Sequence, residues 1–247
     1  MLGSESQKRA LSQSERALSG IRELLFSGVF EPGARLSEPA IADRLQLSRT
    51  PVRAALARLE QEGAVDSIPS GGFSVRKFAT DDILDAIELR GVLEGTAARL
   101  AAERGISPAK AMSFKTLLSE IDALLQVPES DIDHASYTAS NAAFHGLLKE
   151  SCDSSVIARE IDRLTGLPFA SPNALLMVQR DLPEFHGSLV LAQSQHRAIV
   201  NAIELREGSR AEALAREHAR LARRNLEVAM NDDRIKARYP ALILVTA

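Results

Sequence analysis

The chain has 247 residues, of which 45% are hydrophobic, 26% charged and only 4% aromatic, and its formal net charge is −3. This composition is typical of a globular protein of one or two domains whose core favours helices, and the charge alone does not indicate a nucleic-acid binder. The single cysteine, Cys152, excludes an internal disulfide and a cysteine-based zinc site.

Residues 1–78 are predicted to form a small N-terminal domain of short elements. Its first residues lack the apolar segment of a signal peptide, and no apolar run in the chain is long enough to span a membrane, so we expect a cytoplasmic protein without a membrane partner. The predicted elements are a helix over 10–27, a turn-rich connection over 28–36, helices over 37–45 and 48–62 capped by Ser37 and Ser48, and strands over 65–68 and 73–76 around a glycine turn. This order is that of a winged helix-turn-helix domain.

The segment SRTPVRAALARLEQEG (48–63) has a surface suited to DNA. Its Val and Leu residues at i, i+4 and i+7 form a buried stripe, while Arg49 and Arg53 lie four residues apart on a neighbouring exposed stripe. The positive N-terminus of a helix attracts phosphate, and an arginine can bond a guanine edge in two places. Ser48 and Thr50 can bond phosphates or bases. An amphipathic helix with a solvated basic face is the alternative interpretation.

Residues 21–76 resemble the DNA-binding domain of the GntR family of bacterial transcription regulators. The run S-R-T-P-V-R-x-A-L is highly specific for that family. The resemblance implies that Arg49, Thr50 and Arg53 contact operator DNA and that Gly71 and Gly72 form the tip of the wing. It also runs through Gly28, Pro32-Gly33, Leu36-Ser37-Glu38, Ile41-Ala42, Leu45, Leu59, Glu62-Gly63, Phe73 and Val75.

Three positions depart from the family pattern and bear on operator sequence and affinity. Gln46 stands where the family often has a turn glycine, so a non-glycine residue is expected to need a positive φ there. Pro39 stands where some members carry a DNA-contacting Arg or Lys. The wing sequence PSGG (69–72) lacks the basic residue often found there.

The composition changes at 75–82, where we place a domain boundary with Thr80 as the cap of the next helix. Residues 79–231 are predicted to form an all-α antiparallel bundle of six or seven helices, and residues 232–247 a C-terminal tail that packs on the body or on a partner subunit. The fold class is therefore mainly α. The predicted helices cover about 80–104, 107–126, 131–151, 153–166, 172–181, 187–207 and 209–231.

Three of the five histidines, His145, His196 and His218, lie in segments with helical apolar spacing, so each could point into the bundle. Taken singly, such a histidine is more often a hydrogen-bonded core residue than a ligand, and the sequence does not show that the three converge. The other two, His134 and His186, are expected at the surface.

Residues 80–231 resemble the all-helical FCD effector domain of the FadR-type branch of the GntR family. In its metal-binding members an Asp and a His four residues apart join two later His around one divalent ion. By this resemblance His145, His196 and His218 are ligands of a metal such as Zn or Ni, and Asn141 stands in the Asp position. The matching segments are ELRGVLEGTAARLAA (88–102), NAAFHGLLKES (141–151), SQHRAIVNAIELREGS (194–209) and AREHARLARRNL (215–226).

Asn141 offers an ion only a neutral carbonyl oxygen, so we expect metal binding to be weaker than with Asp. Without a metal, the same asparagine and the three histidines could hold an acidic effector directly. Arg90 is a further candidate for binding the effector carboxylate, and a salt bridge to Glu94 at i+4 is the alternative.

The leading hypothesis is a ligand-responsive transcriptional regulator, more specifically a repressor. A homodimer would bind operator DNA, and its helical domain would sense a small carboxylate effector. One alternative is a helical domain that only dimerises. Another is a three-His metalloenzyme, but we find no HExxH motif and no suitably spaced general base, and residues 21–76 would then have no role. We therefore expect no catalytic residues.

Overall fold

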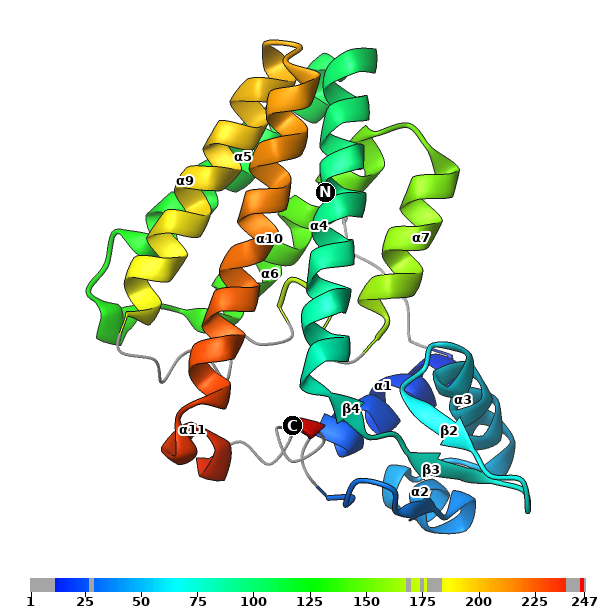
Figure 1. Ribbon diagram of the computed structural model, residues 1–247. Helices are drawn as coiled ribbons and strands as arrows, with labels where there is room; N and C mark the ends of the chain where they lie inside the picture. The colour runs from blue at the N-terminus through cyan, green and yellow to red at the C-terminus, as the bar shows by residue number, and fades with distance from the viewer. Residues whose placement is uncertain are drawn as a thin grey trace, which may run out of the picture. The chain divides into compact units, whose positions relative to one another are not determined.

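Figure 1 shows the computed structural model, which describes residues 12–26, 29–167, 170–173, 176, 184–238 and 245–246. The described chain divides into two units that meet in sequence at Phe78 and Ala79, and Val245–Thr246 belong with the first unit. The predicted fold class is confirmed, because a small mixed N-terminal unit is followed by an all-helical one.

The N-terminal unit is a winged helix-turn-helix. Its elements are α1 (Gln13–Phe26), β1 (Arg35–Leu36), α2 (Glu38–Leu45), α3 (Arg49–Gln61), β2 (Val65–Ser67) and β3 (Phe73–Val75). The strands form an antiparallel sheet in the order β1-β3-β2. β1 lies where only a turn was expected, since two residues are too few for a periodic signal. The core draws apolar side chains from all three helices, among them Ile21, Leu25, Ile41, Val52, Leu56 and Leu59. Gly28 and the ends of the expected helix at 10–11 and 27 lie outside the described residues.

Three polar residues shape the turns around α2 and α3. Ser37 caps α2 as expected, because its Oγ accepts from the amide of Ala40 at 3.4 Å. Gln46 ends that helix at φ 53°, which confirms the positive φ expected of this position. Ser48 occupies the N-cap of α3, but its side chain makes no capping hydrogen bond, so the expected cap is present in backbone conformation only.

The C-terminal unit is a bundle of long helices. They are α4 (Thr80–Arg104), α5 (Pro108–Leu125), α6 (His134–Ser151), α7 (Ser155–Thr165), α9 (Phe185–Glu204), α10 (Gly208–Met230) and α11 (Asp233–Arg238), with a short 3-10 turn at Glu129–Asp131. Figure 1 shows α4, α10 and α9 running side by side. Among the described residues, no helix has both the length and the apolar character needed to cross a membrane.

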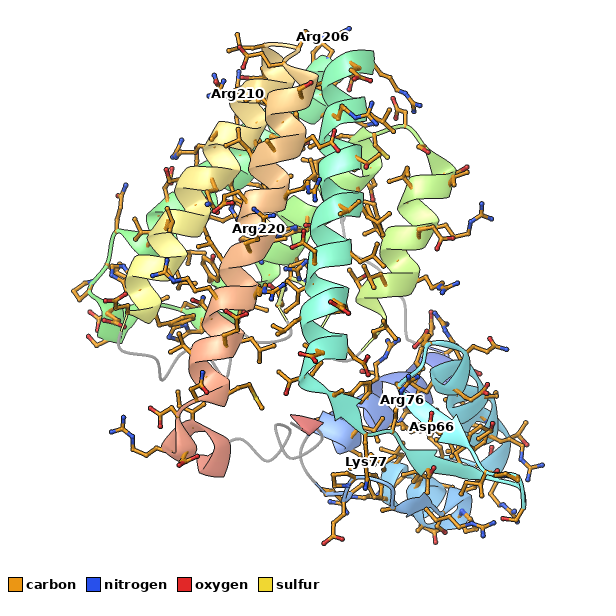
Figure 2. The ribbon with its side chains drawn as sticks, viewed as in Figure 1. Asp66, Arg76, Lys77, Arg206, Arg210 and Arg220 are labelled. Atoms are coloured by element: carbon orange, nitrogen blue, oxygen red, sulfur yellow. The ribbon has the colours of Figure 1, made fainter. Side chains whose placement is uncertain are left out.

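Glycines allow α4 and α10 to pack closely. A Cβ added to Gly91 would come within 2.9 Å of the Cβ of Ala219, and one added to Gly95 within 2.9 Å of the Cγ of Arg216. The outer side of α10 carries arginines such as Arg220 (Figure 2), which is half-exposed and pairs with acidic side chains. The close contact of α4 and α10 places the polar residues of both helices at one internal site.

The boundaries of the C-terminal unit differ from the expectation at three places. Ala79 rather than Thr80 is the N-cap of α4, because Thr80 is already helical. The helix expected at 172–181 lies mostly outside the described residues. The expected tail contains α11, and Val245–Thr246 (β5) pair with Phe78–Ala79 (β4), so these two tail residues pack on the chain itself.

Candidate functional site

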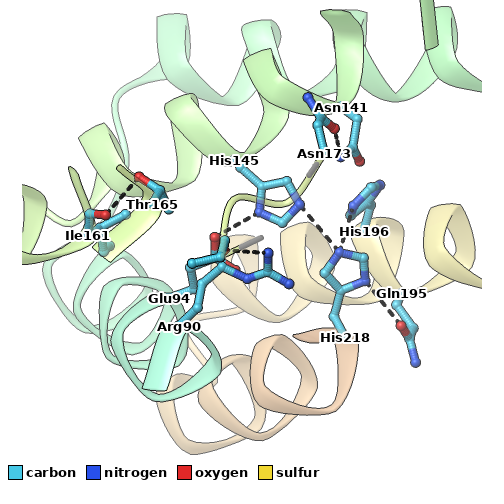
Figure 3. Close-up of polar contacts among 11 residues, drawn as sticks. Arg90, Glu94, Asn141, His145, Ile161, Thr165, Asn173, Gln195, His196 and His218 are labelled. Carbon is cyan, nitrogen blue, oxygen red and sulfur yellow. Dashed lines mark hydrogen bonds and ion pairs between the residues drawn. The ribbon is translucent and has the colours of Figure 1, made fainter. Parts of the chain in front are cut away.

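Three helices bring three histidines to one point in the C-terminal unit. His145 comes from α6, His196 from α9 and His218 from α10, and one ring nitrogen of each lies within 4.8 Å of the others. The Nε2 of His218 lies 3.1 Å from that of His196 and 3.4 Å from that of His145 (Figure 3). The histidines singled out in the sequence are therefore brought together, which their spacing alone could not show.

The opposite nitrogen of each ring faces an acceptor outside the cluster. The Nδ1 of His145 lies 3.0 Å from a carboxylate oxygen of Glu94, and the Nδ1 of His196 lies 3.2 Å from the Oε1 of Gln193. The amide of Gln193 is oriented by two donations from its Nε2, one to the carbonyl of Leu118 and one to the carboxylate of Asp122.

The third ring follows the same pattern, with the Nδ1 of His218 3.1 Å from the Oε1 of Gln195 (Figure 3). A neutral imidazole that donates from Nδ1 keeps a lone pair on Nε2. With all three rings in that tautomer, three lone pairs would face one another at the centre of the cluster. A cation could join them, and outward Nδ1–H donation is the usual support of a metal-binding histidine. The donor set fits a divalent ion.

Burial keeps two of these rings uncharged. Desolvation is the main cause that lowers the pKa of His196 well below 6.5, and the neighbouring histidines act in the same direction. Desolvation likewise lowers the pKa of His218 to about 3. Neutral imidazoles are the form that binds a metal, so at neutral pH these two residues need lose no proton before binding one.

A buried ion pair on α4 borders the cluster. Arg90 and Glu94 are each 3% exposed, and their nearest charged atoms, Nε and Oε2, are 3.9 Å apart. Burial alone would raise the pKa of Glu94, but His145 and Arg90 outweigh it and lower the value to about 2. Arg90 also donates to the carbonyl of Ala170 at 3.0 Å, while its Nε has no hydrogen-bond partner among the described residues. The ion pair with Glu94 agrees with the alternative offered for Arg90, and its role toward an effector stays a prediction.

Glu94 is a site residue that sequence reasoning did not identify as one. It was visible only as the i+4 neighbour of Arg90, and its contact with His145 joins residues 51 apart in the chain. The periodic apolar spacing around it gave no signal of that contact.

Asn141 lies one turn before His145 and is 5% exposed. Its Nδ2 donates to the Oδ1 of Asn173 at 2.8 Å, and the Nδ2 of Asn173 donates to the carbonyl of Thr138 at 2.9 Å. This chain of donations orients the amide of Asn141 and leaves its carbonyl oxygen as the atom that could face an ion.

A small cavity of about 50 Å³ adjoins the cluster, and we call it the inner pocket. Its polar lining includes Arg90, Tyr137, Asn141, His145 and His218. A volume of this size accommodates an ion with a few water molecules or the carboxylate end of a ligand, but not a long organic acid.

The expected DNA-binding residues lie together at the start of α3. Ser48, Arg49, Thr50 and Arg53 are all exposed, whereas the apolar stripe of the helix is buried as predicted. Arg53 is 69% exposed at its side chain and pairs with Glu38 of α2, with its Nε 3.1 Å from both carboxylate oxygens. An ion pair this exposed is weak and can be exchanged for a contact with phosphate or a base.

The wing sequence PSGG has no basic residue, but an arginine from another strand lies at the tip of the wing. Gly71 and Gly72 adopt φ of 90° and 94°, a backbone conformation in which any residue with a side chain would be strained. Arg35 of β1 lies beside them and donates from Nη2 to the carbonyl of Gly71 at 2.7 Å. The signal was absent from the sequence because β1 was not expected and Arg35 is 36 residues from Gly71.

The two histidines expected at the surface are half-buried. The ring of His134 stacks on Phe185 with a centroid separation of 5.8 Å. The Nε2 of His186 is buried and has no hydrogen-bond partner among the described residues. Both residues keep part of their surface exposed, so the expectation is not contradicted, but the packing at the start of α9 covers more of them than their polar flanks suggested.

Comparison with known proteins places both units in described families. Residues 13–75 match the family described as bacterial regulatory proteins, gntR family, and residues 85–221, more than half of the chain, match the FCD domain. A probable D-xylose utilization operon transcriptional repressor of Paenarthrobacter nicotinovorans is 30% identical over 186 residues, which are 75% of this chain and 76% of that protein.

Two further proteins are similar to the chain, one in sequence and one in fold. The HTH-type transcriptional repressor GlaR of Escherichia coli is 26% identical over 207 residues, covering 82% of this chain and 91% of the repressor. The solved structure of E. coli McbR/YncC is similar with a TM-score of 0.64 at 19% identity, over 89% of this chain and 98% of that chain. At this identity the structural likeness shows the fold alone.

Proposed function

Because the chain belongs to the GntR family of bacterial regulatory proteins and carries an FCD domain, we propose that it is a repressor that senses a small organic acid at a metal held by its buried histidines. Like its relatives, it is a DNA-binding transcriptional regulator, and it is not an enzyme. The repressor role, the metal and the acid are the proposed part.

The metal proposal rests chiefly on the three Nε2 lone pairs that face one another. His145, His196 and His218 would hold a divalent ion such as Zn or Ni through these atoms, because each Nδ1 already faces an acceptor. Asn141 could add its carbonyl oxygen. When bound, the ion would act as a Lewis acid that attracts the carboxylate of the effector.

The acid proposal rests on the charges around the inner pocket. Arg90 and Glu94 offset one another, and Asn141 and the imidazoles of His196 and His218 are neutral, so a dication in the cluster would bring two uncompensated positive charges. A buried charge is stable only when paired. A carboxylate from a small ligand would supply that partner, and Arg90 lies in the wall where it would arrive.

The DNA proposal assigns contacts to both ends of the winged domain. Arg49, Thr50 and Arg53 at the exposed start of α3 would read operator bases or phosphates, with Ser48 beside them. Gly71 and Gly72 would let the wing approach the backbone closely. A cytoplasmic homodimer would place two such domains on the two half-sites of a near-palindromic DNA operator.

The proposal is tested by metal analysis and calorimetry on the purified full chain. We expect the protein to bind one Zn or Ni ion per chain and to lose that ion when His145, His196 or His218 is replaced by Ala. Stripped protein that takes up neither ion, and that no small carboxylate stabilises against heat, would leave a helical domain that only dimerises.

A further inference from the structure

A second cavity of about 750 Å³ lies beside the inner pocket in the C-terminal unit. We call it the outer cavity. It lies between the start of α9 and the last turns of α10, and its lining includes Phe185, His186, Leu191, Leu221, Arg224 and Val228. Its volume falls in the range of cavities that hold metabolites and drugs, roughly 300–1,000 Å³.

The outer cavity and the inner pocket share one wall. Ser188, Leu221 and Asn225 line both. The Nδ2 of Asn225 donates to the Oγ of Ser188 at 2.8 Å, so one hydrogen bond between α9 and α10 stands at the boundary. Both of these side chains can bond a carboxylate as well as each other.

The inner pocket is too small for a long organic acid. Its volume of about 50 Å³ suits a carboxylate beside a metal. Any ligand with more than two or three further atoms must place them elsewhere. The shared wall leads to the outer cavity, which has sufficient size.

The lining of the outer cavity defines the ligand that would fit it. Phe185, Leu191, Leu221 and Val228 offer an apolar surface. The buried Nε2 of His186 has no hydrogen-bond partner among the described residues and would pair with a polar group of a ligand. This combination suits an apolar body that ends in a hydrogen-bonding group.

We propose that the effector is an elongated organic acid, with its carboxylate at the histidine cluster and its apolar body in the outer cavity. This inference rests on the proposed acid sensing at the cluster and adds the class of acid. It separates such ligands from short acids, which the inner pocket would hold alone.

A glycine pair permits a clean test. Gly187 lines the outer cavity and not the inner pocket, and a Cβ added there meets no atom within 4 Å. Gly146 on α6 has the same free space and lines neither cavity. Gly187→Phe should therefore fill the outer cavity, and Gly146→Phe is its matched control. Leu191→Arg, at a side chain already 44% exposed, is a second variant with little risk to folding.

The experiment is calorimetry on zinc-loaded full-length protein with propionate and 4-phenylbutyrate. We expect wild type and Gly146→Phe to bind 4-phenylbutyrate at least about tenfold more tightly than propionate. Gly187→Phe and Leu191→Arg should lose most of that difference and keep their propionate affinity.

Two results would overturn the inference alone: equal affinity for both acids in the wild type, or a tenfold preference that survives in both Gly187→Phe and Leu191→Arg. Failure of both acids to bind wild type would overturn the proposed acid sensing and this inference with it.

Discussion

The Nδ1 of His145 lies 3.0 Å from the Oε1 of Glu94, and both side chains are buried. The carboxylate accepts a hydrogen bond from the Nδ1–H, so the lone pair of His145 is directed from Nε2 to the other histidines. Glu94 is thereby a positioning residue for the cluster, and it brings a negative charge close to an ion without contacting it.

Replacing Glu94 by Gln should weaken metal binding by about 10- to 100-fold, because the amide can still accept from Nδ1 but carries no charge. Calorimetric titration of Zn or Ni into stripped protein measures this effect. Glu103→Gln, at a half-exposed position near the end of the same helix, is the control. A purely structural role for Glu94 would lower the melting temperature of the metal-free variant and leave its metal affinity unchanged.

Asn141→Asp should tighten metal binding by roughly tenfold or more, since a carboxylate restores the missing negative charge next to the three imidazoles. The same substitution should make zinc affinity less dependent on added acid, because the ion is then partly compensated. Zinc titrations are made without propionate and with propionate at about ten times its dissociation constant. They give the zinc affinity and its dependence on added acid. Equal zinc affinity in Asn141→Asp and wild type would show that the side chain does not face the ion.

Stability of the metal-free protein should fall between pH 7 and pH 5. The pKa of His218 is about 3 in the folded chain, against 6.5 unperturbed. Below pH 6.5 this histidine is therefore protonated in the unfolded chain but not in the folded chain, which favours unfolding. The resulting loss is roughly 2 kcal/mol for this histidine at pH 5, and His196 adds to it in the same direction.

Urea unfolding of stripped protein at the two pH values measures this loss, and His218→Asn should reduce it. The pKa of Glu94 is lowered instead to about 2, so its contribution is lost only as the pH falls below 4.5 and does not affect the comparison. An equal loss in wild type and variant would contradict the buried neutral state of His218.

The sequence predicted the long helices to within a few residues because each has several turns of periodic apolar spacing. It could not predict β1, whose two residues gain their strand conformation by pairing with β3. The residues of the site likewise fall into those that the sequence could predict and those that it could not. The histidines could be selected by their helical setting, whereas the partners of His145 and Asn141, Glu94 and Asn173, depend on how helices distant in sequence pack.

Arg49→Ala should weaken operator binding by roughly 1–3 kcal/mol and relax the preference at one base pair, and Arg53→Ala should do so too. The operator is first selected from a random duplex pool, and affinities follow by fluorescence anisotropy. Because Arg53 pairs with Glu38 in the free protein, Glu38→Gln should instead raise affinity modestly. Unchanged affinity in both arginine variants would remove α3 from the DNA interface.

Arg35→Ala should lower the salt dependence of DNA binding. The guanidinium uses one Nη2 hydrogen on the carbonyl of Gly71 and is otherwise exposed at the tip of the wing, so its remaining donors can meet a phosphate. Each lost phosphate contact reduces the slope of log K against log salt by about 0.9. Anisotropy titrations of a mixed-sequence duplex over a range of KCl concentrations measure that slope without knowledge of the operator.

Two further variants separate charge from wing rigidity. Arg35→Lys keeps the charge and should keep the slope, and Arg159→Ala, on the exposed side of α7 in the other unit, should leave both slope and affinity unchanged. If Arg35→Ala lowers affinity without changing the slope, Arg35 only braces Gly71. Since the wing sequence PSGG has no basic residue, the wing would then contact DNA through its backbone alone.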